Sequence, residues 1–167
     1  MSILIRFLLA SSLLLGASGS ANAACEGDAH RQFDFWLGEW EVHTPEGKLA
    51  GVNRISREYD GCVLHERYTG ASGYTGESLN IFDAARQVWH QTWVDSGGTL
   101  LLLEGGLQDG AMVLGGRGRN AKGVDVEHRI TWTPNADGSV RQHWQARETD
   151  GEWKTVFDGR YTRKPAD

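Results

Sequence analysis

Cysteine is scarce in this chain of 167 residues, which contains only Cys25 and Cys62. Two cysteines are too few for a disulfide-rich scaffold, and their spacing matches no zinc-binding pattern. In an oxidising compartment, a bridge between Cys25 and Cys62 would tie the N-terminal segment to the rest of the protein. The sequence leaves open whether the two cysteines are bridged or are free thiols.

Clusters of lysine and arginine are also missing. The chain has 17 basic residues against 22 acidic ones, which gives a formal net charge of −5. Nucleic-acid-binding domains carry basic patches, and helices that lie on membranes are basic and amphipathic. We therefore expect no nucleic-acid partner and no attachment of the mature chain to a membrane.

A long apolar run occurs only near the N-terminus, from Phe7 to Leu15. It is too short to span a bilayer, which takes about 20 residues. It follows Arg6 and leads to the small residues at 21–23, Ala-Asn-Ala, which have the A-x-A form of a cleavage site. This pattern is typical of a secretory signal peptide.

We therefore expect residues 1–23 to be a signal peptide, cleaved before Ala24. Residues 24–167 then form a single domain, and the mature protein is periplasmic or secreted. The alternatives are an uncleaved membrane anchor and a lipid on Cys25. Asn22 stands where a lipid-attachment motif would have leucine, which argues against the lipid.

Proline is scarce at 3 residues, whereas glycine is abundant at 22. Turn sequences such as Asp60-Gly61 and Asp137-Gly138 recur at short intervals, and runs rich in Val, Ile, Thr and Trp lie between them. Short strands at such spacing predict an all-β sandwich or barrel. We predict ten strands, near 40–44, 52–59, 62–69, 77–82, 88–95, 99–105, 111–115, 124–133, 139–148 and 153–161. Only residues 28–37 are expected to form a short helix.

The connections between these strands are short, which favours an antiparallel meander. A meander of this length exposes two strand edges unless it closes on itself, and closure into a barrel removes both edges. We therefore predict an all-β, up-and-down antiparallel barrel of about ten strands, preceded by a short N-terminal helix. We expect it to be a monomer.

Side chains alternate between the two faces of a strand, so the sequence predicts which residues point into the barrel. In the stretch 62–68, Glu66 shares a face with Leu64, opposite the more polar face that carries His65. In the stretch 78–82 the alternation is ambiguous. The turn at 136–138 looks like a three-residue hairpin, which pairs Trp132 with Gln142.

The predicted interior mixes aromatic and polar side chains. A packed core avoids unpaired polar groups, whereas a ligand cavity is mostly apolar with a few convergent polar groups. We therefore expect the barrel to bind a small, partly apolar molecule, with no cofactor. The candidate ligand-binding residues are Asn53, Glu66, Asn80, Gln91, Trp93, Asp95, Gln142 and Trp144. The alternative is that the tryptophans and polar groups form an ordinary core.

Two other functions remain open. Glu66 and Asp95 could act as a pair of carboxylates in a small acid–base enzyme, or could simply accept hydrogen bonds. None of the six histidines forms an H-x-H pair, and only His128 is predicted to face inward. A closed metal site needs three or four ligands, so we expect no metal site. Haem or metal binding through His128 stays as an alternative.

The motif Gly38-Glu39-Trp40 resembles the G-x-W signature of lipocalins and their calycin relatives. In those barrels the tryptophan packs across the closed end, and a basic residue of the last strand lies over it. The resemblance implies a structural floor made of Gly38, Trp40 and either Arg160 or Arg163.

A longer resemblance covers nearly all of Phe33 to Arg163. The stretches FDFWLGEWEV, GASGYTGESLNIFD, VWHQTWVDSGG and RITWTPNADGSVRQHW resemble a family of exported bacterial proteins known only as a domain of unknown function. The resemblance implies a calycin-type barrel and assigns no catalytic residue. The ten predicted strands are also similar to nitrobindin, a haem-binding barrel. Its haem ligand is a histidine near the C-terminus, whereas the last histidine here is His143.

Overall fold

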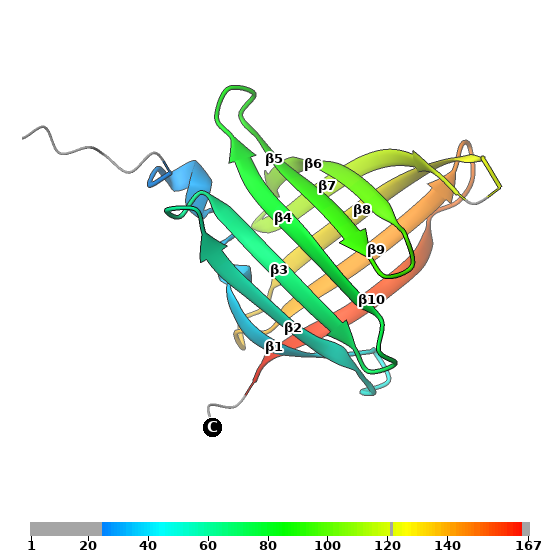
Figure 1. Ribbon diagram of the computed structural model, residues 1–167, viewed down its shortest axis with the longest axis horizontal. Coiled ribbons are helices and arrows are strands. Elements are labelled where there is room, and N and C mark those ends of the chain that lie inside the picture. The colour runs from blue at the N-terminus through cyan, green and yellow to red at the C-terminus, as the bar shows by residue number, and fades with distance from the viewer. Residues whose placement is uncertain (1–24, 121, 165–167) are drawn as a thin grey trace, which may run out of the picture.

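The structure is a computed structural model that describes residues 25–120 and 122–164. Ten antiparallel strands form a closed barrel in which each strand pairs with its neighbours in sequence and β1 also pairs with β10 (Figure 1). The strands are β1 (Gly38–His43), β2 (Leu49–Glu58), β3 (Val63–Gly70), β4 (Thr75–Asp83), β5 (Val88–Asp95), β6 (Leu100–Gln108), β7 (Ala111–Arg119), β8 (Asp125–Pro134), β9 (Val140–Glu148) and β10 (Lys154–Arg163). The predicted up-and-down barrel is confirmed, and it is consistent with a calycin-like fold.

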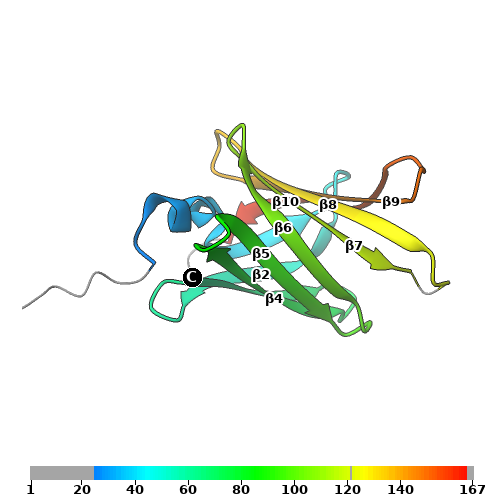
Figure 2. The same cartoon turned by 90° about the horizontal axis from the view of Figure 1, so that it is seen from above.

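Two short 3₁₀ helices precede the barrel, η1 (Asp28–Arg31) and η2 (Asp34–Trp36), in the segment predicted to be helical. Both views show these blue helices at one end of the barrel and the β7–β8 turn at the other (Figures 1 and 2). We call the first the closed end and the second the open end. The predicted signal peptide and its cleavage site lie outside the described residues. Among those residues, no helix is long and apolar enough to cross a membrane.

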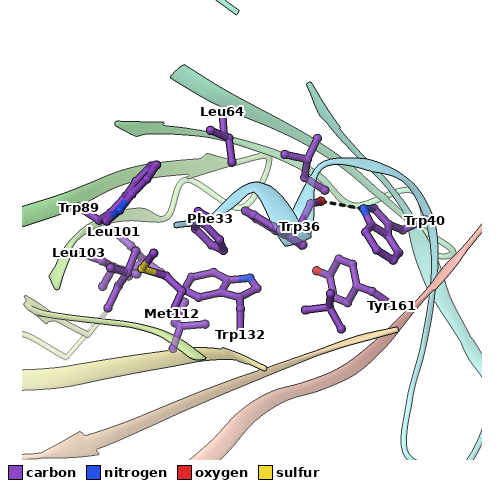
Figure 3. Close-up of a cluster of buried hydrophobic side chains, with 14 of the residues drawn as sticks. Phe33, Trp36, Trp40, Leu64, Trp89, Leu101, Leu103, Met112, Trp132 and Tyr161 are labelled. Carbon is purple, nitrogen blue, oxygen red and sulfur yellow. Dashed lines mark hydrogen bonds between the residues drawn. The ribbon is translucent and has the colours of Figure 1, made fainter. Parts of the chain in front are cut away.

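The core at the closed end is aromatic. Phe33 and Trp36, from the segment with η2, are fully buried, and their rings stack with centroids 4.9 Å apart. Phe33 also meets the rings of Trp132 at 5.2 Å and Trp89 at 5.7 Å, both edge-on. Figure 3 shows Phe33 and Trp36 lying between Trp89 on one side and Trp40 on the other. The N-terminal segment therefore fills the closed end of the barrel with aromatic rings.

Trp40 is held in place from two sides. Its indole Nε1 donates a hydrogen bond to the Trp36 carbonyl oxygen at 2.9 Å (Figure 3), and the Arg163 guanidinium lies 3.9 Å from its ring centroid. Gly38 has φ of 131°, a backbone conformation that favours glycine, and a Cβ there would collide with the Arg163 guanidinium. The geometry is that of the predicted floor, with Arg163 as the basic residue over the tryptophan.

Arg160, the other candidate for this place, does not belong to the floor. Tyr161 points inward and is buried, so alternation along β10 puts Arg160 on the outer face. There it forms an ion pair with Asp137 of the β8–β9 turn. Of the two candidates that the resemblance left open, Arg163 therefore takes the position over Trp40 and Arg160 does not.

The two cysteines are joined in a disulfide, with their Cα atoms 5.0 Å apart and 37 positions apart in sequence. Cys62 lies in the turn between β2 and β3, next to the closed end. The bridge therefore fastens the segment before η1 to the barrel wall. The sequence left open whether these cysteines are bridged or free, and the structure has them bridged.

Candidate ligand-binding site

The half of the barrel toward the open end holds a cavity of about 240 Å³. It extends from the buried Glu66 to Tyr74 and Val156, which are partly exposed at the open end. The lining residues are Glu66, Tyr68, Tyr74, Gln91, Trp93, Leu101, Ile130, Gln142, Trp144, Val156, Phe157 and Tyr161. Five of the eight predicted ligand-binding residues are among them, namely Glu66, Gln91, Trp93, Gln142 and Trp144. The structure thus brings these five together around one space.

Glu66 is the charged group of this lining, and it is only 2% exposed. Alternation along β3 turns it inward, as predicted. Its Oε1 accepts a hydrogen bond from Asn53 Nδ2 at 2.7 Å, and its Oε2 accepts one from Ser78 Oγ at 2.6 Å. Burial raises the pKa of Glu66 to about 7, although these two hydrogen bonds favour the charged form and oppose the increase. The carboxyl group can therefore gain or lose a proton near neutral pH.

Asn53 and Asn80 lie behind the lining and support it. Both are buried. Asn80 Nδ2 donates to Ser78 Oγ at 2.9 Å and to the Leu64 carbonyl oxygen at 3.0 Å, while its Oδ1 accepts from Gln91 Nε2 at 2.7 Å. These two asparagines therefore position Glu66 and Gln91. Neither is among the residues that line the cavity.

The polar network continues to the other side of Glu66. Asn53 Nδ2 also donates to the Tyr161 hydroxyl at 3.3 Å, and that hydroxyl donates to Gln142 Oε1. The connected side chains, in order around the wall, are Gln142, Tyr161, Asn53, Glu66, Ser78, Asn80 and Gln91. They come from β9, β10, β2, β3, β4 and β5. A continuous polar belt therefore runs along one wall of the cavity, and its lining members are Glu66, Gln91, Gln142 and Tyr161.

Aromatic rings provide much of the rest of the lining. The Trp93 indole lies against the backbone of β4 at Gly76, where a Cβ would come within 2.2 Å of the ring. Only glycine leaves room for this close approach. Trp93 Nε1 donates to Asp95 Oδ2 at 3.0 Å, and Trp144 Nε1 donates to His128 Nδ1 at 3.2 Å. Both indoles are therefore fixed by hydrogen bonds that point away from the ligand space.

Asp95 lies at the end of β5 and is not among the lining residues. Its Oδ1 accepts from the backbone amides of Gly97 at 2.8 Å and Thr99 at 3.0 Å, and its Oδ2 accepts from the Tyr74 hydroxyl at 2.6 Å. Burial acts to raise the pKa of Asp95, but the hydrogen bonds from Tyr74, Thr99 and Trp93 outweigh it and lower the pKa to about 2. Asp95 therefore anchors the β5–β6 turn and is not brought beside Glu66 in the cavity lining.

His128 lies on the inner face of β8 and is half-buried. Burial lowers its pKa, which favours the neutral ring. In that form its Nδ1 accepts the hydrogen bond from Trp144. Within residues 25–120 and 122–164, no three or more His, Cys, Asp or Glu side chains are grouped so that they could hold a metal ion. His128 therefore serves as the hydrogen-bond partner of a cavity tryptophan.

Several lining residues were not among the sequence-based candidates. Tyr68 and Tyr161 could have been found, since alternation puts them on the same faces as Glu66 and Arg163. Phe157 could also have been found, because it shares the face of Tyr161, whereas Val156 has the opposite parity and could not. The register of β10 against β9 shifts between Thr155 and Phe157, so two consecutive side chains both reach the cavity. A bulge of this kind has no clear sequence signal here.

No model of a known protein family matches this chain, and no curated protein does either. Membership of the exported family that the sequence resembles therefore stays a prediction. The functional conclusion depends on the cavity and on the side chains that line it.

Proposed function

We propose that the protein binds a small, partly apolar molecule inside the barrel. The observation that carries this proposal is an aromatic cavity with one polar wall, reaching from Glu66 to the open end. Ligand sites are typically concave and mostly apolar, with a few polar groups that fix the orientation of the ligand. Here Glu66, Gln91 and Gln142 would fix the polar part, while the aromatic side chains would contact the apolar part.

The cavity size limits the ligand. Its volume of about 240 Å³ lies below the roughly 300–1,000 Å³ typical of sites for drug-sized molecules. A molecule with one ring and a short substituent matches this space.

We also propose that the protein acts outside the cytoplasm, in the periplasm or as a secreted protein. The Cys25–Cys62 disulfide supports this, because disulfides persist in oxidising compartments. The A-x-A sequence before Ala24 supports it from the sequence side. N-terminal sequencing of protein exported by its own host should begin at Ala24, whereas an intact Met1 or a lipid on Cys25 would contradict this proposal.

Native mass spectrometry of protein purified from its own host tests the binding function. We expect a retained small molecule in the wild type. Val156 is half-exposed at the mouth of the cavity, so Val156→Trp should obstruct entry while leaving the closed end untouched. Val94→Trp is the matched control, because Val94 is also about half-exposed but is not among the lining residues.

The retained mass should appear in the wild type and in Val94→Trp, and should be lost in Val156→Trp. A retained mass that survives in Val156→Trp would place the molecule elsewhere. Absence of any retained mass, together with no small molecule that raises the melting temperature, would contradict the binding function.

General acid–base catalysis by Glu66 is a second candidate function. The observation that favours it is a pKa near 7 in a buried, ligand-accessible position, since an efficient catalytic acid or base has its pKa near the working pH. Under this alternative, Glu66→Gln should abolish turnover of a bound substrate while leaving its binding nearly unchanged. Under the binding function, no turnover is lost, because the wild type has none.

A further inference from the structure

The hydrogen-bond donors around the cavity are mostly occupied by the protein itself. The Tyr68 hydroxyl donates to the Ala50 carbonyl oxygen at 2.9 Å. The Tyr74 hydroxyl and the Trp93 indole N–H both donate to Asp95. The Tyr161 hydroxyl donates to Gln142, and the Trp144 indole N–H donates to His128. When Glu66 is ionised, the side-chain amide of Gln142 is the one lining donor with no hydrogen-bond acceptor in the part of the chain that the structure describes. The cavity therefore offers a ligand few donors.

The hydrogen-bond acceptors that line the cavity, in contrast, are only partly occupied by the protein. Each Glu66 oxygen accepts one hydrogen bond, whereas a carboxylate can accept about four in all. Gln91 Nε2 donates to both Asn80 and Ser78, and no described residue donates to Gln91 Oε1. Acceptor capacity therefore remains on Glu66 and Gln91, and a ligand that donates hydrogen bonds would use it.

The charge of the cavity disfavours a negatively charged ligand. No lysine or arginine is among the lining residues, so the charge of ionised Glu66 is not balanced inside the cavity. Asp95 adds a second carboxylate behind Trp93 and Tyr74, at the open end. A negatively charged ligand would meet only like charges there, and burying such a pair without a counter-charge is costly.

The aromatic rings that line the cavity also favour a positively charged ligand. Six of the lining residues are aromatic, namely Tyr68, Tyr74, Trp93, Trp144, Phe157 and Tyr161. The faces of such rings carry negative partial charge and attract cations within about 6 Å of the ring centroid. The same rings also provide apolar surface for a hydrocarbon body.

We propose that the ligand is a small organic cation, a protonated amine on an aromatic or branched hydrocarbon body, whose N–H groups donate to Glu66. This inference rests on the binding function proposed above and specifies its ligand class. The amine supplies both the charge and the donors that the cavity lacks. The negative charge of the cavity excludes carboxylate ligands such as small aromatic or fatty acids.

Three probes of nearly equal size and different charge test the proposal: 2-phenylethylamine, 2-phenylethanol and phenylacetate. Their affinities would be measured by isothermal titration calorimetry at pH 8. At this pH Glu66 is mostly ionised, because its pKa is about 7, and an aliphatic amine keeps its proton. We expect the amine to bind about tenfold more tightly than the alcohol, since charge-assisted hydrogen bonds are roughly twice as strong as neutral ones. Phenylacetate should show no measurable binding.

Glu66→Gln removes the charge and nearly keeps the shape of the side chain. In this variant the affinities for amine and alcohol should converge. Glu46→Gln, in the exposed β1–β2 turn, makes the same chemical change away from the cavity and should keep the tenfold preference. Circular dichroism of both variants checks that the barrel is folded.

The outcomes separate this inference from the binding function. If the alcohol or phenylacetate binds as tightly as the amine, and Val156→Trp abolishes that binding, the cavity is a binding site but the ligand is not a cation. If the amine preference persists in Glu66→Gln, Glu66 does not recognise the charge. If none of the three probes binds, the inference is contradicted, while the binding function is decided separately by the retained mass in native mass spectrometry.

Discussion

The closed end and the cavity half of this barrel are built from the same kinds of side chain in different arrangements. At the closed end, the rings of Phe33, Trp36 and Trp132 pack against one another and are fully buried. The indole Nε1 atoms of Trp36 and Trp132 are buried there with no hydrogen-bond partner among the described residues. In the cavity half, the indole N–H groups of Trp93 and Trp144 are both hydrogen-bonded, and space remains between the rings.

The difference shows how one sheet provides both stability and a site. The closed end gains its stability from apolar area removed from water, which is proportional to how completely the rings are covered. The cavity half keeps its rings apart, and a belt of hydrogen-bonded side chains holds the wall around the open space. Substitutions should therefore cost more at the closed end, and those in the cavity half should act on binding.

The largest expected effect compares two tryptophans. Trp40→Ala should lower the free energy of unfolding by about 3–5 kcal/mol, because it removes a fully buried ring and leaves a void. Trp144→Ala should cost less than about 2 kcal/mol, because Trp144 is only partly buried and already borders a cavity. Urea denaturation monitored by circular dichroism measures both values. Equal losses would mean that the two halves do not differ in packing.

The disulfide extends the comparison to the N-terminal segment, which carries Phe33 and Trp36 into the closed end. Replacing both cysteines by serine should lower the free energy of unfolding by about 2–4 kcal/mol, because the bridge closes a loop of 37 positions in the unfolded chain. The binding affinity of a cavity ligand should not change. A loss of affinity in the folded double variant would show that the two halves are coupled.

Glu66 gives the cavity half a pH dependence that the closed end lacks. Its pKa is about 7 in the folded protein against a usual value of 4.5, so the folded state holds the proton more tightly. The free energy of unfolding should therefore fall by about 3 kcal/mol as the pH rises from about 4.5 to above 7.

Glu66→Gln should remove this decrease, and urea denaturation across the same pH range measures it. Subtracting the profile of the variant from that of the wild type cancels groups common to both, such as Asp95, whose pKa is lowered to about 2. Parallel profiles would show that the pKa of Glu66 is the same in the folded and the unfolded protein.

Much of this architecture could be predicted because short turns and a period of two are local signals. The hairpin turn with Gly138 at positive φ fixed the register of β8 and β9, and the predicted pair Trp132 with Gln142 is confirmed. The same alternation correctly turned Glu66 inward. At 78–82 the alternation did not decide which side chains point inward, and the structure turns Asn80 inward.

The roles of the inward-facing residues were less accessible, because they depend on partners far away in sequence. Asp95 is occupied by Tyr74 from the β3–β4 hairpin, so alternation placed it correctly but could not show that it anchors a turn. Arg160 and Arg163 are both basic and close together, and only the register of β10 decides which lies over Trp40. The cavity is lined by side chains from several strands, so its presence could not be predicted from the pattern of any one strand.

The smallest expected effect concerns two glutamines of the polar wall. Gln91→Leu removes the donor to Asn80 Oδ1 and should lower the free energy of unfolding by about 1–3 kcal/mol, because a buried acceptor is left unpaired. Gln142 is more exposed, so water can replace it beside the Tyr161 hydroxyl, and Gln142→Leu should cost less than about 1 kcal/mol. Gln108→Leu, in an exposed position, is the control. Urea denaturation ranks the three. A larger loss for Gln142→Leu than for Gln91→Leu would show that the structural part of the belt lies on the opposite side of Glu66.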